Sequence, residues 1–195
     1  MSRNEFLINY WDYYCVLEED FIDITRYIQL RVVNFNTCSD EIIKQLQAVG
    51  SEFDNICKVV CGFSMEQRKT IADYQRWLLN NIKDITAVEI KLISADNIVL
   101  RPFEDWDKIN PSDLPWWKAY NSVKHNRIDN YEKGNFKNLL NAIAAVYYLE
   151  MYMFRRIADE TSEMDIPNRM SSVFEIIGWK TRCGSGENLY YETLE

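Results

Sequence analysis

Along most of the chain, apolar residues recur every three or four positions, which is the period of an amphipathic helix. The first such stretch begins at Leu7 and predicts one long helix over about Arg3–Phe35. Tyr13 lies off the main apolar stripe, so the start of this helix is apolar on more than one side. Either a second subunit or a wider core would cover that end, and the pattern leaves both open.

Two further helices are predicted from the residues that cap helix ends. Ser39 is a suitable N-cap, and the two acidic residues after it suit the positive end of a helix dipole. The helix that starts there is predicted to end at Gly62. Ser64 and Gln67 form an S-x-x-Q capping box, which predicts that a third helix begins at this point and continues to about Ile82.

The period then changes from helical to alternating. Apolar residues at every second position from Val88 to Leu92, followed by "SADN" and "IVL", predict a small β-hairpin. Residues 101–115 form an irregular loop that is rich in aromatic residues and proline. Asp113 is the predicted N-cap of a fourth helix that carries Pro115 in its first turn and runs to about Arg127.

A fifth helix is predicted from Phe136 to Ala158, and the tail from Ser171 holds two strand-like runs, "VFEII" and "NLYYETL", that suggest a second hairpin. Five helices with short connections indicate a mainly α protein, an antiparallel helical bundle with one or two small β-hairpins.

The same pattern predicts a single domain over residues 1–195. Within it, 86–115 would be an insertion made of the hairpin and the aromatic loop, and 170–195 a β-like C-terminal appendage.

Composition narrows the class of protein. The chain has 195 residues, 47% of them hydrophobic, and only six Gly and four Pro, which excludes a disordered chain and a loop-rich β protein. Five scattered cysteines without a CxxC pair, and one histidine, make no zinc signature, so we expect reduced thiols, no metal and no cofactor. Ser2 to Glu5 lead directly into an amphipathic pattern, so we expect no signal peptide, and the most apolar run, Leu139–Phe154, is shorter than a membrane span. We therefore expect a cytoplasmic protein with no membrane contact.

A net charge of −8 argues against a surface that is coated for nucleic-acid binding, but it leaves room for a local basic patch. Residues 118–137 hold five positive and two negative side chains, a local charge of +3. An anionic ligand would prefer this region to most of the surface. The acidic run from Glu18 to Asp20 is expected to be a solvated helix surface.

The candidate chemistry lies in "WWKAYNSVKHNR", which contains His125, the single histidine. Lys118, Asn121 and His125 share one face of the predicted fourth helix, while Trp116 and Tyr120 lie on a side that is typical of a core. Histidine can move a proton near neutral pH, and cations can stabilise phosphoryl oxygens, so the face suits phosphate binding or metal-independent phosphodiester cleavage. The alternative is a histidine that merely makes a favourable contact at a helix end.

This region resembles the HEPN family of antiparallel four-helix bundles. The resemblance rests on a long first helix, on "SDEII" opening the second, and on "YNSVKHNR" before the last long helix, and it covers about Arg3 to Ile157. The family motif is an arginine, often followed by a polar residue, and then a histidine ("RNxxxH"). Asn121 matches the polar position and His125 the histidine, whereas Tyr120 stands where the family has its arginine. "YNxxKHxR" preceded by "PWW" also looks like a signature of a HEPN-like group.

The resemblance implies a homodimer and a role in a toxin–antitoxin, phage-defence or RNA-processing system. One hypothesis is a metal-independent endoribonuclease in which His125 is the general acid or base and Asn121 orients phosphate or imidazole. Lys124 or Arg127 would replace the missing arginine, and Tyr120 would donate a hydrogen bond to phosphate. Lys118, Trp116 and Trp117 would contact the substrate, which would be RNA or a nucleotide.

The other hypothesis is a non-catalytic interaction module that binds RNA, a nucleotide, an antitoxin or another protein partner. The net charge and the substitution at Tyr120 favour this module, and the polar face with its local basic charge favours the nuclease.

Overall fold

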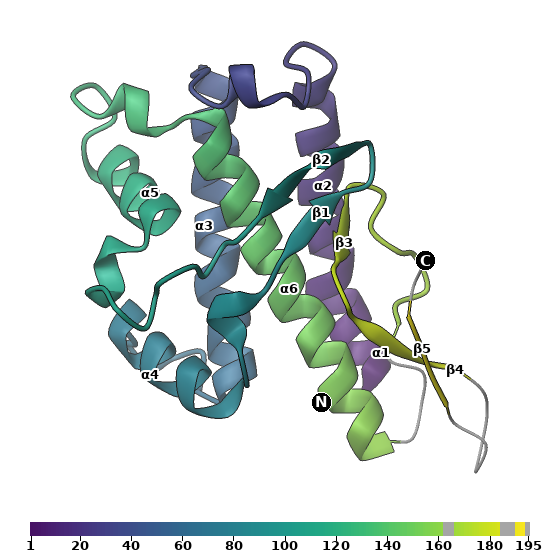
Figure 1. Ribbon diagram of the computed structural model, residues 1–195. Coiled ribbons are helices and arrows are strands. Elements are labelled where there is room, and N and C mark those ends of the chain that lie inside the picture. The colour runs from purple at the N-terminus through teal and green to yellow at the C-terminus, as the bar shows by residue number, and fades with distance from the viewer. Residues whose placement is uncertain (162–165, 184–189, 194–195) are drawn as a thin grey trace.

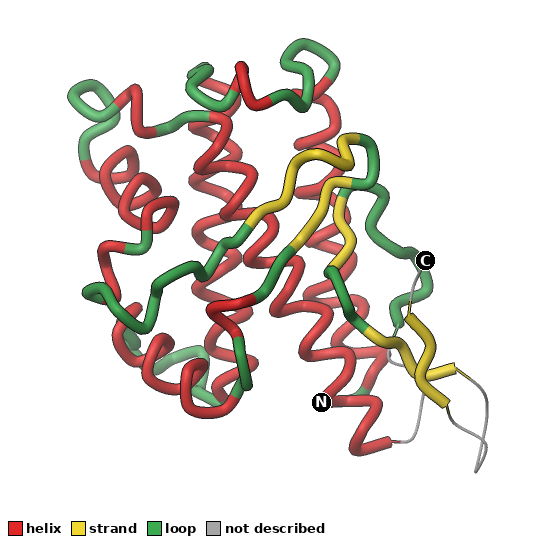
Figure 2. The backbone as a smooth tube through the Cα atoms, viewed as in Figure 1, coloured by secondary structure: helices red, strands yellow, loops and turns green. Residues whose placement is uncertain are grey.

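The computed structural model describes residues 1–161, 166–183 and 190–193. Within these ranges the protein is mainly helical, with a three-stranded antiparallel sheet and a separate two-stranded pair (Figure 1, Figure 2). None of the helices in the described ranges has both the length and the apolarity needed to cross a membrane.

The first helix is shorter than the apolar pattern predicts. It consists of α1 (Arg3–Phe6), a π-helical turn (Leu7–Trp11) and α2 (Asp12–Thr25), which follow one another directly. The prediction that it continues to Phe35 is wrong. The Thr25 hydroxyl donates a hydrogen bond to the carbonyl of Ile22 at 2.7 Å, and such side-chain bonds compete with the regular helical ladder.

The segment after α2 instead covers the start of the last helix. A 3₁₀ turn (Val32–Asn34) leads into backbone hydrogen bonds from Phe136 N–H to the carbonyl of Thr37 (2.9 Å) and from Lys137 N–H to the carbonyl of Phe35 (3.0 Å). These bonds satisfy two amides of a helix N-terminus that have no partner within the helix itself. A contact distant in sequence therefore decides the conformation of this segment.

The ends of α3 (Asp40–Cys61) confirm the prediction. The Ser39 side chain accepts a hydrogen bond from the Ile42 amide at 3.1 Å, and Gly62 takes a left-handed conformation with φ of 70°. Both are local cap geometries that these residue types favour. Local cap residues, Ser39 and Gly62, therefore determine where α3 begins and ends.

The start of α4 (Ile71–Asn81) lies later than predicted. Thr70 and Asp73 form the capping box, with 2.9 Å between the Thr70 hydroxyl and the Asp73 carboxylate. Ser64 and Gln67 form only a turn, in which the Gln67 amide donates to the Ser64 carbonyl at 3.0 Å. The apolar face begins immediately after Thr70, and an N-cap normally stands next to the first apolar residue.

The predicted first hairpin is confirmed and gains a third strand. A 3₁₀ turn (Ile85–Ala87) precedes β1 (Ile90–Leu92), which pairs antiparallel with β2 (Ala95–Leu100). On its other edge β1 pairs antiparallel with β3 (Phe174–Ile176), so the sheet order is β2-β1-β3. The run "VFEII" therefore joins the first hairpin.

The second hairpin pairs different residues from those predicted. Its strands are β4 (Lys180–Cys183) and β5 (Tyr190–Thr193), so the described part of "NLYYETL" pairs with the stretch before "GSGE". Burial of Phe174 explains why β3 pairs with β1 and not with β5. The Phe174 ring packs 5.8 Å from that of Tyr147 and 6.2 Å from that of Phe21.

The core is built around α6 (Phe136–Thr161), which contacts α1, α2, α3 and strands β2 and β3. A 3₁₀ turn (Tyr131–Lys133) precedes it, and all residues from Ala142 to Met151 are buried. A helix that is apolar on all sides is a buried helix. In Figure 1, α3 lies along α6, and α2 and α5 (Pro115–His125) flank this pair. The three-stranded sheet crosses the face of α6.

Candidate functional site

The predicted site lies on α5 (Pro115–His125), which packs against α3 and α6. Pro115 opens the helix as predicted, but the N-cap position is Leu114, and Asp113 instead ends a 3₁₀ turn (Pro111–Asp113). Proline is well suited to a first helical position because its missing amide would have no partner there. The start of α5 is thus set by Pro115 and not by a side-chain cap.

The two tryptophans proposed to contact substrate are part of the core. The Trp116 indole N–H donates to the carbonyl of Pro102 at 2.8 Å, and its ring meets Phe53 edge-to-face at 4.7 Å. Trp117 is also buried and lies 5.5 Å from the Phe53 ring. Neither ring face is presented to solvent, so both tryptophans position α5 and do not stack on a base in this structure.

Tyr120, in the arginine position of the family motif, is buried between helices. A Cβ atom added to Gly50 of α3 would overlap the Tyr120 ring, so the two helices approach closely because residue 50 is glycine. The Tyr120 hydroxyl accepts a hydrogen bond from Lys124 Nζ at 3.1 Å, and the ammonium lies 5.1 Å from the ring centroid. Tyr120 therefore anchors Lys124 at the end of α5.

Two of the three polar residues on the predicted face are satisfied within the chain. Asn121 is half-buried and donates from Nδ2 to the carbonyl of Trp117 at 3.1 Å. Lys118 is exposed and pairs with Asp113 at 2.7 Å. The hydrogen bond from Lys118, followed by one from Asn110, lowers the pKa of Asp113. These contacts hold the side chains in place and neutralise one of the local positive charges.

His125 is the last residue of α5, and its side chain is exposed. Within the described ranges the imidazole makes no hydrogen bond or ion pair. Lys133 lies close to the same helix end, because its Nζ contacts Ser122 Oγ at 3.4 Å and Asn130 Oδ1 at 2.7 Å. We call His125, Lys124 and Lys133 the basic end of α5, since none of the three is paired with a carboxylate in the described part of the chain.

Arg127 belongs to a different contact. The helix ends before it, and its Nη1 pairs with Asp40 Oδ1 of α3 at 2.8 Å. This ion pair fastens the turn after α5 to the start of α3, so Arg127 does not stand beside His125 as a substitute for the missing arginine. The basic end of α5 can therefore bind an anion, but one chain does not surround His125 with the groups that an acid–base reaction needs.

Sequence reasoning missed three buried carboxyl groups, those of Glu18, Glu52 and Glu150. Glu52 accepts a hydrogen bond from Asn55 Nδ2 at 3.1 Å. Glu18 was expected on a solvated surface, yet it is buried and accepts hydrogen bonds from Tyr14 at 2.6 Å, from the Ser172 amide at 2.8 Å and from the Ser171 hydroxyl. Glu150 is fully buried, and neither of its carboxyl oxygens has a hydrogen-bond partner. Burial, and then the nearby charge of Glu52, raise its pKa well above the usual range.

Only Glu150 left a signal in the sequence, as a charged residue inside the most apolar run. In the described ranges, no three or more His, Cys, Asp and Glu side chains are grouped so that they could hold a metal ion.

No family model, no curated protein and no solved structure matches this chain. Its function has to be argued from the residues of the site.

Proposed function

We propose that this protein is a HEPN-like antiparallel helical bundle that binds RNA through the basic end of α5. The observation that carries the proposal is the exposure of His125 beside Lys124 and Lys133, with no carboxylate paired to any of them in the described ranges. Ammonium groups bind phosphate oxygens as point charges, and such contacts supply most of the affinity for a nucleic-acid backbone.

The rest of the surface restricts where an anionic chain can bind. The net charge of −8 disfavours RNA elsewhere, and two of the cations near α5, Lys118 and Arg127, are already neutralised by Asp113 and Asp40. A small patch with a few phosphate contacts fits recognition of a short single-stranded or looped segment better than that of a long duplex.

A metal-independent endoribonuclease is the second candidate, and it requires a homodimer. The accessible imidazole of His125 favours it, because a second copy could place its own His125 and lysines across the phosphate. One histidine would then give a proton to the leaving oxygen while lysines stabilise the charge on the phosphoryl oxygens. This arrangement would suit a toxin or phage-defence protein that is controlled by an antitoxin or another protein partner.

RNA binding can be tested by fluorescence anisotropy with a labelled hairpin RNA over a range of salt concentrations. Changing Lys124 and Lys133 together to glutamine should weaken binding and lower the slope of log affinity against log salt by about two. The matched control changes Arg68 and Arg76, two exposed cations before and within α4 that have no ion pair in the described ranges, to glutamine. An equal loss in the control would mean that the RNA responds only to net charge, and the proposed surface would be wrong.

An RNA-cleavage assay distinguishes the RNA-binding module from the endoribonuclease. The same RNA is incubated in EDTA with the wild type and with His125→Ala, while light scattering reports whether each is a dimer. Because His125 is exposed, the variant is expected to fold as the wild type does. Cleavage that disappears in the variant supports the nuclease, whereas RNA binding without cleavage by either protein supports the binding module.

A further inference from the structure

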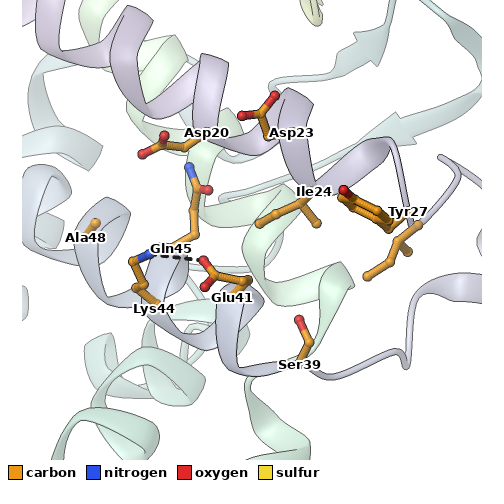
Figure 3. Close-up of a pocket in the computed structure, with 10 residues that line it drawn as sticks. Asp20, Asp23, Ile24, Tyr27, Ser39, Glu41, Lys44, Gln45 and Ala48 are labelled. Atoms are coloured by element: carbon orange, nitrogen blue, oxygen red, sulfur yellow. Dashed lines mark hydrogen bonds and ion pairs between the residues drawn. The ribbon is translucent and has the colours of Figure 1, made fainter.

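A cavity of about 570 Å³ opens between the end of α2 and the start of α3, on residues that the proposed function does not use (Figure 3). Its volume is in the range of sites that hold a small organic molecule. The chain leaves α2 at Thr25 and reaches the N-cap of α3 at Ser39, and the cavity lies between these two helix ends, with Tyr27 and Ile28 among its lining residues (Figure 3).

Carboxylates predominate around the cavity. Asp20 and Asp23 line it from α2, and Glu41 lines it from α3, with Lys44 as the single cation among the lining residues. Lys44 pairs with Glu41 at 3.1 Å, and Asp23 pairs with Arg26 at 3.1 Å. Asp20 makes no hydrogen bond or ion pair with any described residue, so its charge is available to a ligand.

Gln45 provides a separate indication of a ligand with hydrogen-bond donors. Its side chain is only 6% exposed, and its amide nitrogen donates to the carbonyl of Leu17 at 2.5 Å. This bond fixes the amide, so the oxygen Oε1 lies on the side of the cavity that faces Ile24 (Figure 3). No described residue donates to that oxygen, and it is not one of the fully enclosed unpaired atoms, so a ligand in the cavity could donate to it in place of water.

The remaining wall is apolar. Ile24, Ile28 and Ala48 line the cavity, and Tyr27 stands at its rim with 89% of its surface exposed. A bare metal ion prefers oxygen ligands and keeps its water shell, so it would gain nothing from this wall. A molecule with methylene groups would gain by burying them there, and an ammonium group is also attracted to a tyrosine ring.

We propose that this cavity binds an aliphatic diamine or polyamine. Its ammonium groups would contact Asp20, Asp23 and the Gln45 oxygen, and its methylene chain would lie on Ile24 and Ala48. The proposal does not depend on RNA binding, because it uses the opposite charge and different helices.

The test is isothermal titration calorimetry with four probes: spermidine, diaminohexane, hexanediol and magnesium ion. Diaminohexane and hexanediol share the carbon chain and differ in charge, while magnesium carries the charge without the chain. Saturable one-site binding is expected for the two amines and for neither of the other probes. Magnesium binding as tight as that of diaminohexane would overturn the proposal, since it would indicate simple attraction to an acidic surface.

Substitutions inside and outside the cavity test whether the amine binds there. Changing Asp20 and Asp23 together to asparagine should weaken diaminohexane binding at least about fivefold, whereas the same charge change at Glu104 and Asp107 (to glutamine and asparagine) should leave it within about twofold. Ala48→Phe should abolish binding by filling the cavity without changing any charge. Unaltered binding in either cavity variant, or an equal loss in the charge-matched control, would overturn the proposal. If Ala48→Phe fails to fold, diaminohexane binding by the Asp20 and Asp23 double variant tests the proposal, because both side chains are exposed.

Discussion

Glu150→Gln should stabilise the protein at neutral pH and leave its stability almost unchanged near pH 4.5, the ordinary pKa of a glutamate. Glu150 lies in the stretch of α6 that is buried on all sides, and neither carboxyl oxygen has a hydrogen-bond partner. Burial, and then repulsion from Glu52, raise its pKa well above the ordinary value, so over a pH range above 4.5 the folded protein keeps this proton while the unfolded chain has released it. Glutamine has nearly the same shape and never ionises.

The magnitude follows from proton linkage. Below the unfolded-state pKa both the folded and the unfolded state hold the proton, so Glu150 does not lower the free energy of unfolding. Above it the unfolded chain releases the proton while the folded protein keeps it, so the free energy of unfolding falls by about 1.4 kcal/mol for each pH unit. The fall ends at the raised folded-state pKa. Between these two pKa values, the advantage of Glu150→Gln over the wild type should grow by the same amount per unit.

Urea unfolding followed by circular dichroism, repeated at half-unit pH intervals from about 4.5 to 8, measures this difference. Glu132→Gln removes a carboxylate that is exposed, so its profile should run parallel to that of the wild type. Glu52→Gln removes the repulsion that helps to raise the Glu150 pKa, so the slope in that background should end at a lower pH. Parallel profiles for the wild type and Glu150→Gln would refute the reasoning, because they would mean that a partner compensates the buried charge.

Three further predictions concern the scaffold. Thr70→Ala should lower the free energy of unfolding by about 1 kcal/mol through loss of the α4 cap, whereas Ser64→Ala should change it by less than about 0.5 kcal/mol; chemical denaturation distinguishes the two. Gly50→Ala should destabilise by about 1–3 kcal/mol, although alanine favours helices, because its methyl group meets the Tyr120 ring; a smaller cost in a Tyr120→Leu background would identify that contact. Glu18→Ala should cost about 3 kcal/mol or more in the same assay, because several buried donors lose their acceptor.

The elements that the sequence predicted correctly have ends that are determined locally, although the local cap of α4 was placed at Ser64 and not at Thr70. Ser39 and Gly62 bound α3 through contacts within a few residues, and the alternation from Val88 onward produced the hairpin of β1 and β2. Where the outcome depended on distant residues, the prediction failed. The apolar period continues past Thr25, but the carbonyls of Phe35 and Thr37 are used by the first amides of α6. Similarly, β3 pairs with β1 far earlier in the chain, and no local pattern specifies that partner.

The candidate site shows the same difference between features set by local spacing and features set by tertiary contacts. Helical spacing placed Trp116 and Tyr120 on the core side of α5, which their burial confirms, and it placed His125 on the polar side, where it is exposed. Spacing alone could not show that Asn121 bonds to its own helix or that Arg127 turns toward Asp40. Those contacts depend on where α5 ends and on which helix lies opposite, and both are tertiary properties.

The π-helical turn at Leu7–Trp11 changes which residues of the first helix face the core. A π turn adds one residue to a helical turn, so it rotates the residues after it relative to those before it. As a result, Phe6 before the turn and Tyr14 after it both reach the core. Tyr13 is not brought inward by this rotation and remains 44% exposed, so a wider core does not cover it within one chain. Of the two alternatives for this end of the helix, contact with a second subunit is the one that stays a prediction.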